Sequence, residues 1–442
     1  MTSDNTQQES VTYQCKRCGA TSALESLFVV TDPPVKGNDK TCVTCLSYEQ
    51  RTSSVTKTIL GWIVPGLFWG AAFTESVQGT AAFVVAIPLA TFLGIFLHEL
   101  GHAAGATLVG AKVVALSFGS GLQMRVFRWH GRFFLFGPLP IEGMTLVNDV
   151  PKRGYRWRMI LIFFAGPAAN LLLAVLLWRY FVTTESGSET LESVVFLFAL
   201  INTLLGVFNL VPFGSANQLG VVSSDGRQIL QHLGMSNSDI TAAAEQVTSG
   251  EAYLEWKYGD PVRAARLLQP EIDRDPPDPY MAILGSAVLL DTKRFSEGIQ
   301  LCERALLQTP IAEVRATLEN NLSCLLIRQG DESDLPRIDI LTKSALRLMS
   351  VSLAVRATRG SYFLRAGRYR DAIALLDDER FVMEKAESQA RVSAHLALAN
   401  FRLGNTDEAS SALDRAKQLY PDLDEIADVE RAMRQELAPE QV

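Results

Sequence analysis

Between Lys57 and Lys112 the chain carries only two charged side chains, Glu75 and Glu99. The surface of a water-soluble protein needs more charged and polar groups than this. The stretch contains two hydrophobic runs, at about 58–74 and 80–104, and two more follow at about 157–180 and 190–212. Each run is close to the roughly 20 residues that cross an apolar bilayer core. We therefore expect four membrane-spanning helices in a lipid bilayer, rather than buried helices of a large soluble core.

The basic residues indicate how these spans are oriented. The 105–158 segment contains eight Lys and Arg residues, whereas the connections 75–79 and 181–189 contain none. By the positive-inside rule the 105–158 segment faces the cytoplasm. An even number of spans then places the N-terminal segment and the C-terminal half on that side too, in a multi-pass protein of the cell membrane. The net charge of -7, without a Lys/Arg-rich run, argues against nucleic acid as a partner.

Two short runs within the 105–158 segment, 113–118 and 132–136, are rich in aromatic and β-branched residues and lie between glycines. This pattern is typical of hairpin strands. Non-helical backbone at membrane depth is tolerated only where it is buried in protein or lines a wet cavity. We expect a small membrane-associated β-hairpin region packed against the spans.

From about residue 241 onward the sequence is helical and repetitive. Similar turn-then-helix phrases begin at Gly259, Gly367 and Gly404, with a weaker copy at Lys293. Gly330, Gly367 and Gly404 are spaced by 37 residues, a period that indicates a helical solenoid. The phrase resembles the tetratricopeptide repeat over about 250–422, and a generic helical bundle is the alternative. A solenoid of this kind would bind a protein partner.

Four of the six cysteines form two CxxC pairs separated by 23 residues: Cys15, Cys18, Cys42 and Cys45. Two thiolates two residues apart fit adjacent corners of a zinc tetrahedron, and the second pair completes it. We expect one structural Zn2+ in a zinc-ribbon-like unit, with a redox dithiol as the alternative. The remaining Cys302 and Cys324 are expected in the helical core.

His98 and His102 lie four residues apart at the end of the second predicted span. On a helix both imidazoles can reach one metal ion while Glu99 approaches its bound water. Such ionisable residues are costly inside a hydrophobic span, and a metal explains them better than a polar cluster between helices. Zinc needs a further protein ligand, and Asp225 is the only ionisable side chain between Glu192 and Arg227. The alternative role for Asp225 is a helix N-terminal acid.

Three motifs occur in order: His98–His102 inside a span, Gly166–Asn170 in the next, and Asn209–Pro212 followed by Asp225. Together they resemble the site-2 protease family of intramembrane zinc metalloproteases, over about 80–232. The resemblance implies that His98, His102 and Asp225 bind a catalytic Zn2+. It also implies that Glu99 is the catalytic acid and base, and that Asn170 polarises or orients the substrate carbonyl.

The 139–143 segment looks like the family's membrane-embedded substrate-binding hairpin. The resemblance therefore implies that Pro140, Ile141, Glu142 and Gly143 contact the substrate. Two departures stand out: Glu142 occupies a position where glycine is common, and twelve residues separate Pro212 from Asp225, more than is usual in the family.

The sequence as a whole predicts a mainly α protein in three parts. A zinc-ribbon-like domain at 1–54 precedes a four-span intramembrane metalloprotease domain at 55–240, and an α-solenoid follows at 241–442. The expected activity is hydrolysis of peptide bonds in membrane-anchored proteins near the cytoplasmic side, in regulated intramembrane proteolysis. The alternatives are a catalytically silent membrane scaffold that recruits partners through its repeats, and a zinc hydrolase of small lipid-soluble substrates.

Overall fold

The computed structural model describes residues 13–15, 21–22, 28–30, 40–42, 77–120, 125–137, 139–184, 189–217, 220–236, 238, 240, 249–378 and 386–437. It divides into two compact units, one formed by 1–52 with 268–442 and the other by 53–267. The predicted first span, 58–74, lies outside the described residues.

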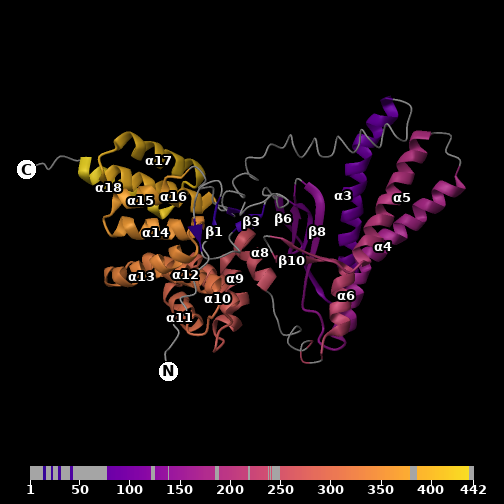
Figure 1. Ribbon diagram of the computed structural model, residues 1–442, viewed down its shortest axis with the longest axis horizontal. Coiled ribbons are helices and arrows are strands. Elements are labelled where there is room, and N and C mark those ends of the chain that lie inside the picture. The colour runs from indigo at the N-terminus through magenta and orange to yellow at the C-terminus, as the bar shows by residue number, and fades with distance from the viewer. Residues whose placement is uncertain are drawn as a thin grey trace, which may run out of the picture. The chain divides into compact units, whose positions relative to one another are not determined.

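Three long helices form the apolar part of the second unit (Figure 1): α3 Val77–Leu108, α4 Tyr155–Thr183 and α5 Glu189–Leu210. Within them, Val84–Leu108, Tyr155–Thr183 and Leu191–Leu210 are long and apolar enough to cross a membrane. Each helix packs against the other two. Many of their outward side chains are large, apolar and exposed, as at Val85 and Leu172, which is favourable only next to lipid. The three predicted spans after the first therefore coincide with helices of spanning length.

A four-stranded sheet follows α3 in the chain, with strands β5 Lys112–Ser120, β6 Arg125–Trp129, β7 Arg132–Phe136 and β8 Leu139–Asn148. The strand order is β6-β7-β5-β8. Two strands match the predicted runs 113–118 and 132–136, but these two pair in parallel rather than as a hairpin. The reason is that β6 lies between them in the chain and forms the hairpin with β7, which then runs in the same direction as β5.

The side chains of the sheet alternate between two covered faces, as the period of two in a strand requires. Phe118 and Phe136 lie on the face that packs against α3, where the Phe118 and Phe96 rings are 4.6 Å apart. Phe133 and Leu135 lie on the opposite face and pack against Leu254. Both faces are thus buried, which explains why these strands are so apolar.

The helix on that opposite face is α8, Ser249–Tyr258, and α9, Pro261–Ile272, follows it. Two buried acids of α8 face basic side chains. Glu255 Oε1 lies 2.8 Å from Arg128 Nη2 and 3.1 Å from Arg263 Nε. Glu251 Oε2 lies 2.8 Å from Lys112 Nζ. We call these five residues the α8 cluster.

Asp225 is brought back to the end of α5 by a short hairpin. The strands β9 Gly214–Asn217 and β10 Gly220–Ser223 pair in antiparallel fashion, and α6, Asp225–Gly234, begins directly after them. The hairpin closes on itself, since the Ser224 amide donates to the Phe213 carbonyl at 3.0 Å. The unusual length of the segment after Pro212 is therefore accommodated without displacing Asp225 from the membrane helices.

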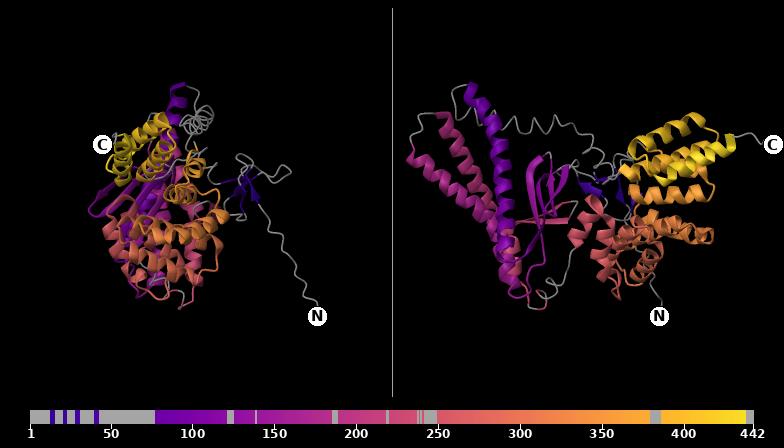
Figure 2. Two further views of the ribbon diagram at one scale, coloured as in Figure 1. Left: turned by 90° about the vertical axis from the view of Figure 1, so that its left-hand side faces the viewer. Right: turned by 180° about the vertical axis from the view of Figure 1, so that it is seen from behind.

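The other unit contains successive helices, shown from behind in Figure 2: α10 Pro279–Asp291, α11 Phe295–Leu306, α12 Ala312–Gln329, α13 Leu335–Leu348, α14 Leu353–Arg365, α15 Tyr369–Leu376, α16 Ala386–Arg402, α17 Thr406–Leu419 and α18 Asp424–Leu437. The even-numbered helices from α10 to α18 also pack on one another. Gly330, Gly367 and Gly404 have positive φ in the turns after α12, α14 and α16. The sequence period thus marks equivalent helix ends, whereas the tetratricopeptide-like assignment stays a prediction.

The N-terminal part of this unit contains two short antiparallel strand pairs, β1 Tyr13–Gln14 with β2 Thr21–Ser22 and β3 Phe28–Val30 with β4 Lys40–Cys42. Cys15 and Cys42 are buried, and the Cys42 amide donates to Cys15 Sγ at 3.2 Å. Cys18 and Cys45 lie outside the described residues, so the four-cysteine zinc site stays a prediction.

Candidate active site

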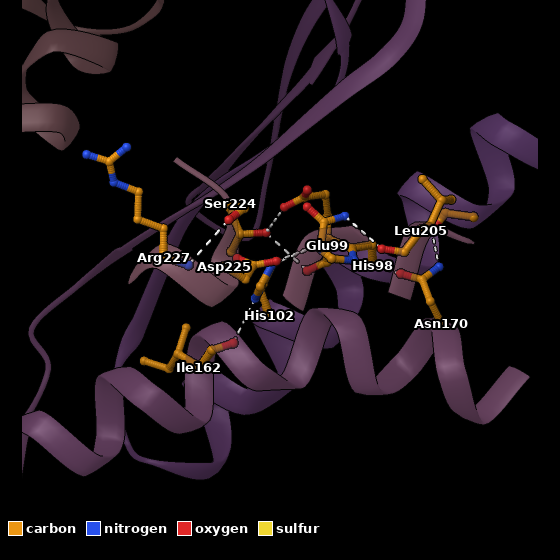
Figure 3. A network of polar contacts seen from close by, with 12 residues as sticks. His98, Glu99, His102, Ile162, Asn170, Leu205, Ser224, Asp225 and Arg227 are labelled. Atoms are coloured by element: carbon orange, nitrogen blue, oxygen red, sulfur yellow. Dashed lines mark hydrogen bonds and ion pairs between the residues drawn. The ribbon is translucent and has the colours of Figure 1, made fainter. Parts of the chain in front are cut away.

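Helix α3 carries three buried ionisable side chains, His98, Glu99 and His102, within its membrane-spanning stretch. The two imidazoles share one face of the helix because they are four residues apart. Asp225, in the first turn of α6, faces the same point (Figure 3). His98 Nε2 lies 3.1 Å from His102 Nε2 and 3.0 Å from Asp225 Oδ2, and His102 Nε2 lies 3.4 Å from Asp225 Oδ1. We call His98, His102 and Asp225 the histidine cluster.

Hydrogen bonds at the Nδ1 atom of each imidazole determine whether its Nε2 atom carries a hydrogen or a lone pair. His102 Nδ1 donates to the Ile162 carbonyl at 2.7 Å, and that oxygen can only accept. His98 Nδ1 donates to Asn170 Oδ1 at 2.6 Å. With its hydrogen on Nδ1, each neutral ring directs the Nε2 lone pair toward the other ring and toward the Asp225 carboxylate.

When both rings are neutral, three electron-pair donors converge with no hydrogen between them, an arrangement that a cation relieves. The three ligand atoms all lie within 4.8 Å of one another. Two imidazole nitrogens and a carboxylate oxygen form a donor set used by catalytic zinc, which keeps a fourth position for water or substrate. The residues present therefore fit a zinc ion. Asp225 also lies in the first turn of α6, as expected for a helix N-terminal acid. It therefore has the position of a helix N-terminal acid and that of a metal ligand at once.

Glu99 lies beside the histidine cluster and is held by the sheet. Thr145 of β8 donates to Glu99 Oε2 at 2.7 Å, and only 4% of Glu99 is exposed. Gly143 lies next to the other oxygen, and a Cβ at position 143 would collide with the carboxylate. The structure therefore brings one of the predicted substrate-binding residues, Gly143, directly to Glu99.

The other predicted substrate-binding residues, Pro140, Ile141 and Glu142, belong to β8, and their side chains lie outside the described parts of the chain. Strand β8 pairs with β5 along one side. Within the described residues, no strand pairs with its other side. In this part of the chain β8 is therefore an edge strand, and Glu99 lies over the face of β8 that carries Gly143 and Thr145.

Two further contacts hold the cluster in shape. Ser224 caps α6: its Oγ accepts from the Phe213 amide at 3.0 Å and donates to the Val211 carbonyl at 2.7 Å, directly before Asp225. Gly166 of α4 leaves room for His102, because a Cβ at that position would collide with the imidazole ring. The Gly166 motif therefore has a steric role at the site.

Asn170 lies at the rear of His98, fully buried. Its Nδ2 donates to the Gly94 carbonyl at 2.8 Å and to Asn202 Oδ1 at 2.9 Å, while Oδ1 accepts from His98. All its polar atoms are engaged by these bonds. The expected contact with a substrate carbonyl would require one of them to break.

Sequence reasoning missed three side chains of this site: Thr145, Asn202 and Ser224. Asn202 had a usable signal, because a buried amide in an otherwise apolar span needs a partner. Ser224 precedes a helix that begins with an acid, which is a recognisable capping pattern. Thr145 had none, since a threonine in a strand is ordinary.

Comparison with known proteins agrees with this geometry. Residues 86–187 match the family model described as Peptidase family M50, a region that contains His98, Glu99, His102 and Asn170 and ends before Asp225. A Helicobacter pylori protein named "Putative zinc metalloprotease" is 31% identical over 129 residues, 26% of this chain and 36% of the relative. A Methanocaldococcus jannaschii zinc metalloprotease is 25% identical over 140 residues, 31% of this chain and 33% of the relative.

The chain thus spans about a third of the length of these relatives. Over this part of its length the chain is thus similar to a peptidase family and to proteins named as zinc metalloproteases, and three of its described helices are long and apolar enough to cross a membrane.

Proposed function

We propose that this chain is a site-2-type intramembrane endopeptidase that cleaves membrane-anchored proteins near the cytoplasmic side of the bilayer. One observation carries the proposal: ligand atoms of His98 and His102, on a helix of membrane-spanning length, and of Asp225 in α6 lie within 4.8 Å of one another, with the Glu99 carboxylate beside them. A scaffold without activity would need the metal ligands at most, and not an acid held next to them.

A zinc ion held by these three residues would activate water as a nucleophile and polarise the scissile carbonyl. Glu99 accepts the proton that the attacking water loses and delivers it to the leaving amine as the C–N bond breaks. Thr145 occupies Glu99 Oε2, so Oε1 is the oxygen left for proton transfer. Glycine at position 143 allows the strand to approach Oε1 closely, because a Cβ there would collide with this oxygen.

The position of β8 at the edge of the described sheet favours a peptide as substrate. A helical substrate has hydrogen-bonded carbonyls, so the segment to be cut must unwind before it can react. An extended segment can then add to β8 as a further strand, with main-chain hydrogen bonds providing affinity. Such a strand would lie next to Gly143, and hence next to Glu99.

The remaining parts fit this role. We assign the 241–442 helices to a tetratricopeptide-like domain that recruits or regulates through a protein partner, because stacked helix pairs form extended binding surfaces. The 1–54 segment is assigned to a zinc ribbon with a structural ion held by Cys15, Cys18, Cys42 and Cys45. Both lie on the cytoplasmic side in this proposal, as the basic 105–158 segment requires.

The test compares membrane proteomes of cells that express the wild type, Glu99→Gln, or the control Glu192→Gln, which makes the same change near the start of α5. Uncut membrane-anchored proteins should accumulate with Glu99→Gln alone. Identical membrane proteomes in all three strains would contradict the proposal, and accumulation in both variants would assign the effect to membrane insertion rather than catalysis.

A further inference from the structure

Three polar side chains from three different membrane helices form one continuous chain in the interior: His98 of α3, Asn170 of α4 and Asn202 of α5. His98 Nδ1 donates to Asn170 Oδ1 at 2.6 Å, and Asn170 Nδ2 donates to Asn202 Oδ1 at 2.9 Å. Both asparagines are fully buried. Buried amides are costly next to lipid, so we look for the role of these hydrogen-bonded side chains in the residue that they position, His98.

The direction of every bond in the chain is determined by backbone oxygens that can only accept. Asn202 Nδ2 donates to the Phe198 carbonyl at 2.9 Å, so its Oδ1 must face Asn170. Asn170 Nδ2 donates to the Gly94 carbonyl at 2.8 Å, so its Oδ1 must face His98. His98 therefore carries its hydrogen on Nδ1 and presents a lone pair on Nε2.

We propose that Asn202 is a positioning residue of the metal site, which acts through Asn170 to hold His98 in its metal-binding tautomer. This rests on the proposed zinc-dependent function. Without the Asn202 acceptor, the second Nδ2 hydrogen of Asn170 has no partner. The Asn170 amide is then held by the Gly94 carbonyl alone, so its Oδ1 is less firmly placed against His98 Nδ1 and the Nδ1–H tautomer of His98 loses support.

A purely structural role predicts something different. Polar bonds between membrane helices stabilise the bundle whether or not they lead to a metal site. The chain offers a matched control at the adjacent residue: Trp178 Nε1 donates to Thr203 Oγ1 at 3.0 Å, also between α4 and α5, with no connection to His98. Thr203→Val removes that interhelical bond with little change of shape.

The experiment uses full-length protein in detergent and measures three quantities: Zn2+ affinity by competition with a chelator, the visible d–d spectrum of the Co2+-loaded protein, and the melting temperature of the metal-free protein. Asn202→Leu should weaken metal affinity by about ten- to a hundredfold, the usual range for residues that orient a ligand, and should alter the Co2+ spectrum. Asn202→Asp should restore both, because a neutral carboxyl keeps an acceptor toward Asn170 and a donor toward Phe198. If Asn202→Leu does not fold, Asn202→Ala, which removes the same acceptor, is measured in its place.

Thr203→Val should lower the melting temperature while leaving affinity and spectrum unchanged. Wild-type affinity and an unchanged spectrum in Asn202→Leu would overturn the proposal, as would an equal loss of affinity in Thr203→Val. A wild-type protein that binds Co2+ but cleaves nothing would overturn the proposed function and leave the role of Asn202 standing. A wild-type protein that binds no metal at its histidines would overturn both.

Discussion

The histidine cluster and the α8 cluster are both buried polar groups of the same unit, yet they are built in opposite ways. In the α8 cluster each carboxylate has cationic partners: Glu255 lies against Arg128 and Arg263, and Glu251 against Lys112. In the histidine cluster two imidazole nitrogens and a carboxylate meet, and with both rings neutral and protonated on Nδ1 all three groups present lone pairs. The first cluster is complete as it stands, whereas the second requires a cation.

This difference separates a structural site from a functional one on physical grounds. Buried polar groups are normally satisfied by partners within the protein, and a cluster that is satisfied holds elements together. A cluster that converges without partners raises the free energy of the folded protein unless a ligand supplies what is missing. We therefore expect the two clusters to respond to substitution in opposite ways, one in metal binding and the other in stability.

The largest effect is expected for His102→Ala. It removes a ligand atom, so metal affinity at the site should fall by more than the roughly hundredfold upper range for residues behind a ligand. The melting temperature of the metal-free protein should change less than the metal affinity, because the relief of converging lone pairs offsets the lost Ile162 hydrogen bond and ring packing. Chelator competition and calorimetry on the same preparation measure both quantities, and wild-type metal affinity in this variant would refute the assignment.

The α8 cluster should show the reverse. Glu255→Leu leaves the guanidinium groups of Arg128 and Arg263 without their shared carboxylate, at a cost of about 1.5–3 kcal/mol in the free energy of unfolding. Metal affinity should stay at the wild-type value. Chemical unfolding followed by Trp fluorescence gives the first quantity, and a variant that loses metal while keeping its stability would reverse the two roles.

Ser224→Ala is expected to change both stability and metal affinity, each by a smaller amount than the substitutions above. It deletes the N-cap of α6 and the bonds that close the hairpin before Asp225, and loss of such a cap costs about 0.5–2 kcal/mol. Because Asp225 follows directly, we expect a lower melting temperature together with a modest loss of metal affinity. Ser224→Thr, which keeps the hydroxyl, is the matched control and should behave as wild type; a full-strength metal site in the Ala variant would separate the cap from the cluster.

The smallest effect concerns pH. Burial alone would raise the pKa of Glu251, but the bonds to Lys112 and Asn148 and the charge of Arg263 outweigh it and hold the pKa below its usual value. A depressed folded-state pKa stabilises the protein above the unfolded-state pKa of about 4.3, and this contribution is lost as pH falls through the folded value. The melting temperature of Glu251→Gln should therefore depend less on pH than that of the wild type below about pH 5. Parallel curves for the two proteins would contradict this ion-pair account.

The histidine cluster could largely be anticipated from sequence, and the α8 cluster could not. His98 and His102 are four residues apart in an apolar stretch, so helix geometry alone brings them together. The sequence predicts Asp225 as a ligand because no other carboxylate or imidazole lies between Glu192 and Asp225, although the β9–β10 hairpin that returns it to the helices has no clear sequence signal.

Glu251 and Glu255 gave no such indication. Charged residues on a helix are usually solvated, and the partners Lys112 and Arg128 lie more than a hundred residues earlier in the chain. For the same reason the sequence does not predict that α8 covers the sheet. Because α8 follows residue 240, the sequence instead places it in the repeat region. The parallel pairing of β5 with β7 was missed because it depends on β6, whose exposed, basic sequence does not follow a strand pattern of the usual kind.

The central claim is that a metal site in a membrane helix performs peptide hydrolysis with Glu99 as its acid and base. The most direct test is cleavage of a synthetic transmembrane peptide by purified wild type and Glu99→Gln, with the zinc content of both proteins measured in parallel. Because general acid–base catalysis contributes about a hundred- to ten-thousandfold in rate, Glu99→Gln should lose at least 99% of the activity while it retains the wild-type zinc content. Cleavage by Glu99→Gln at close to the wild-type rate would contradict the account.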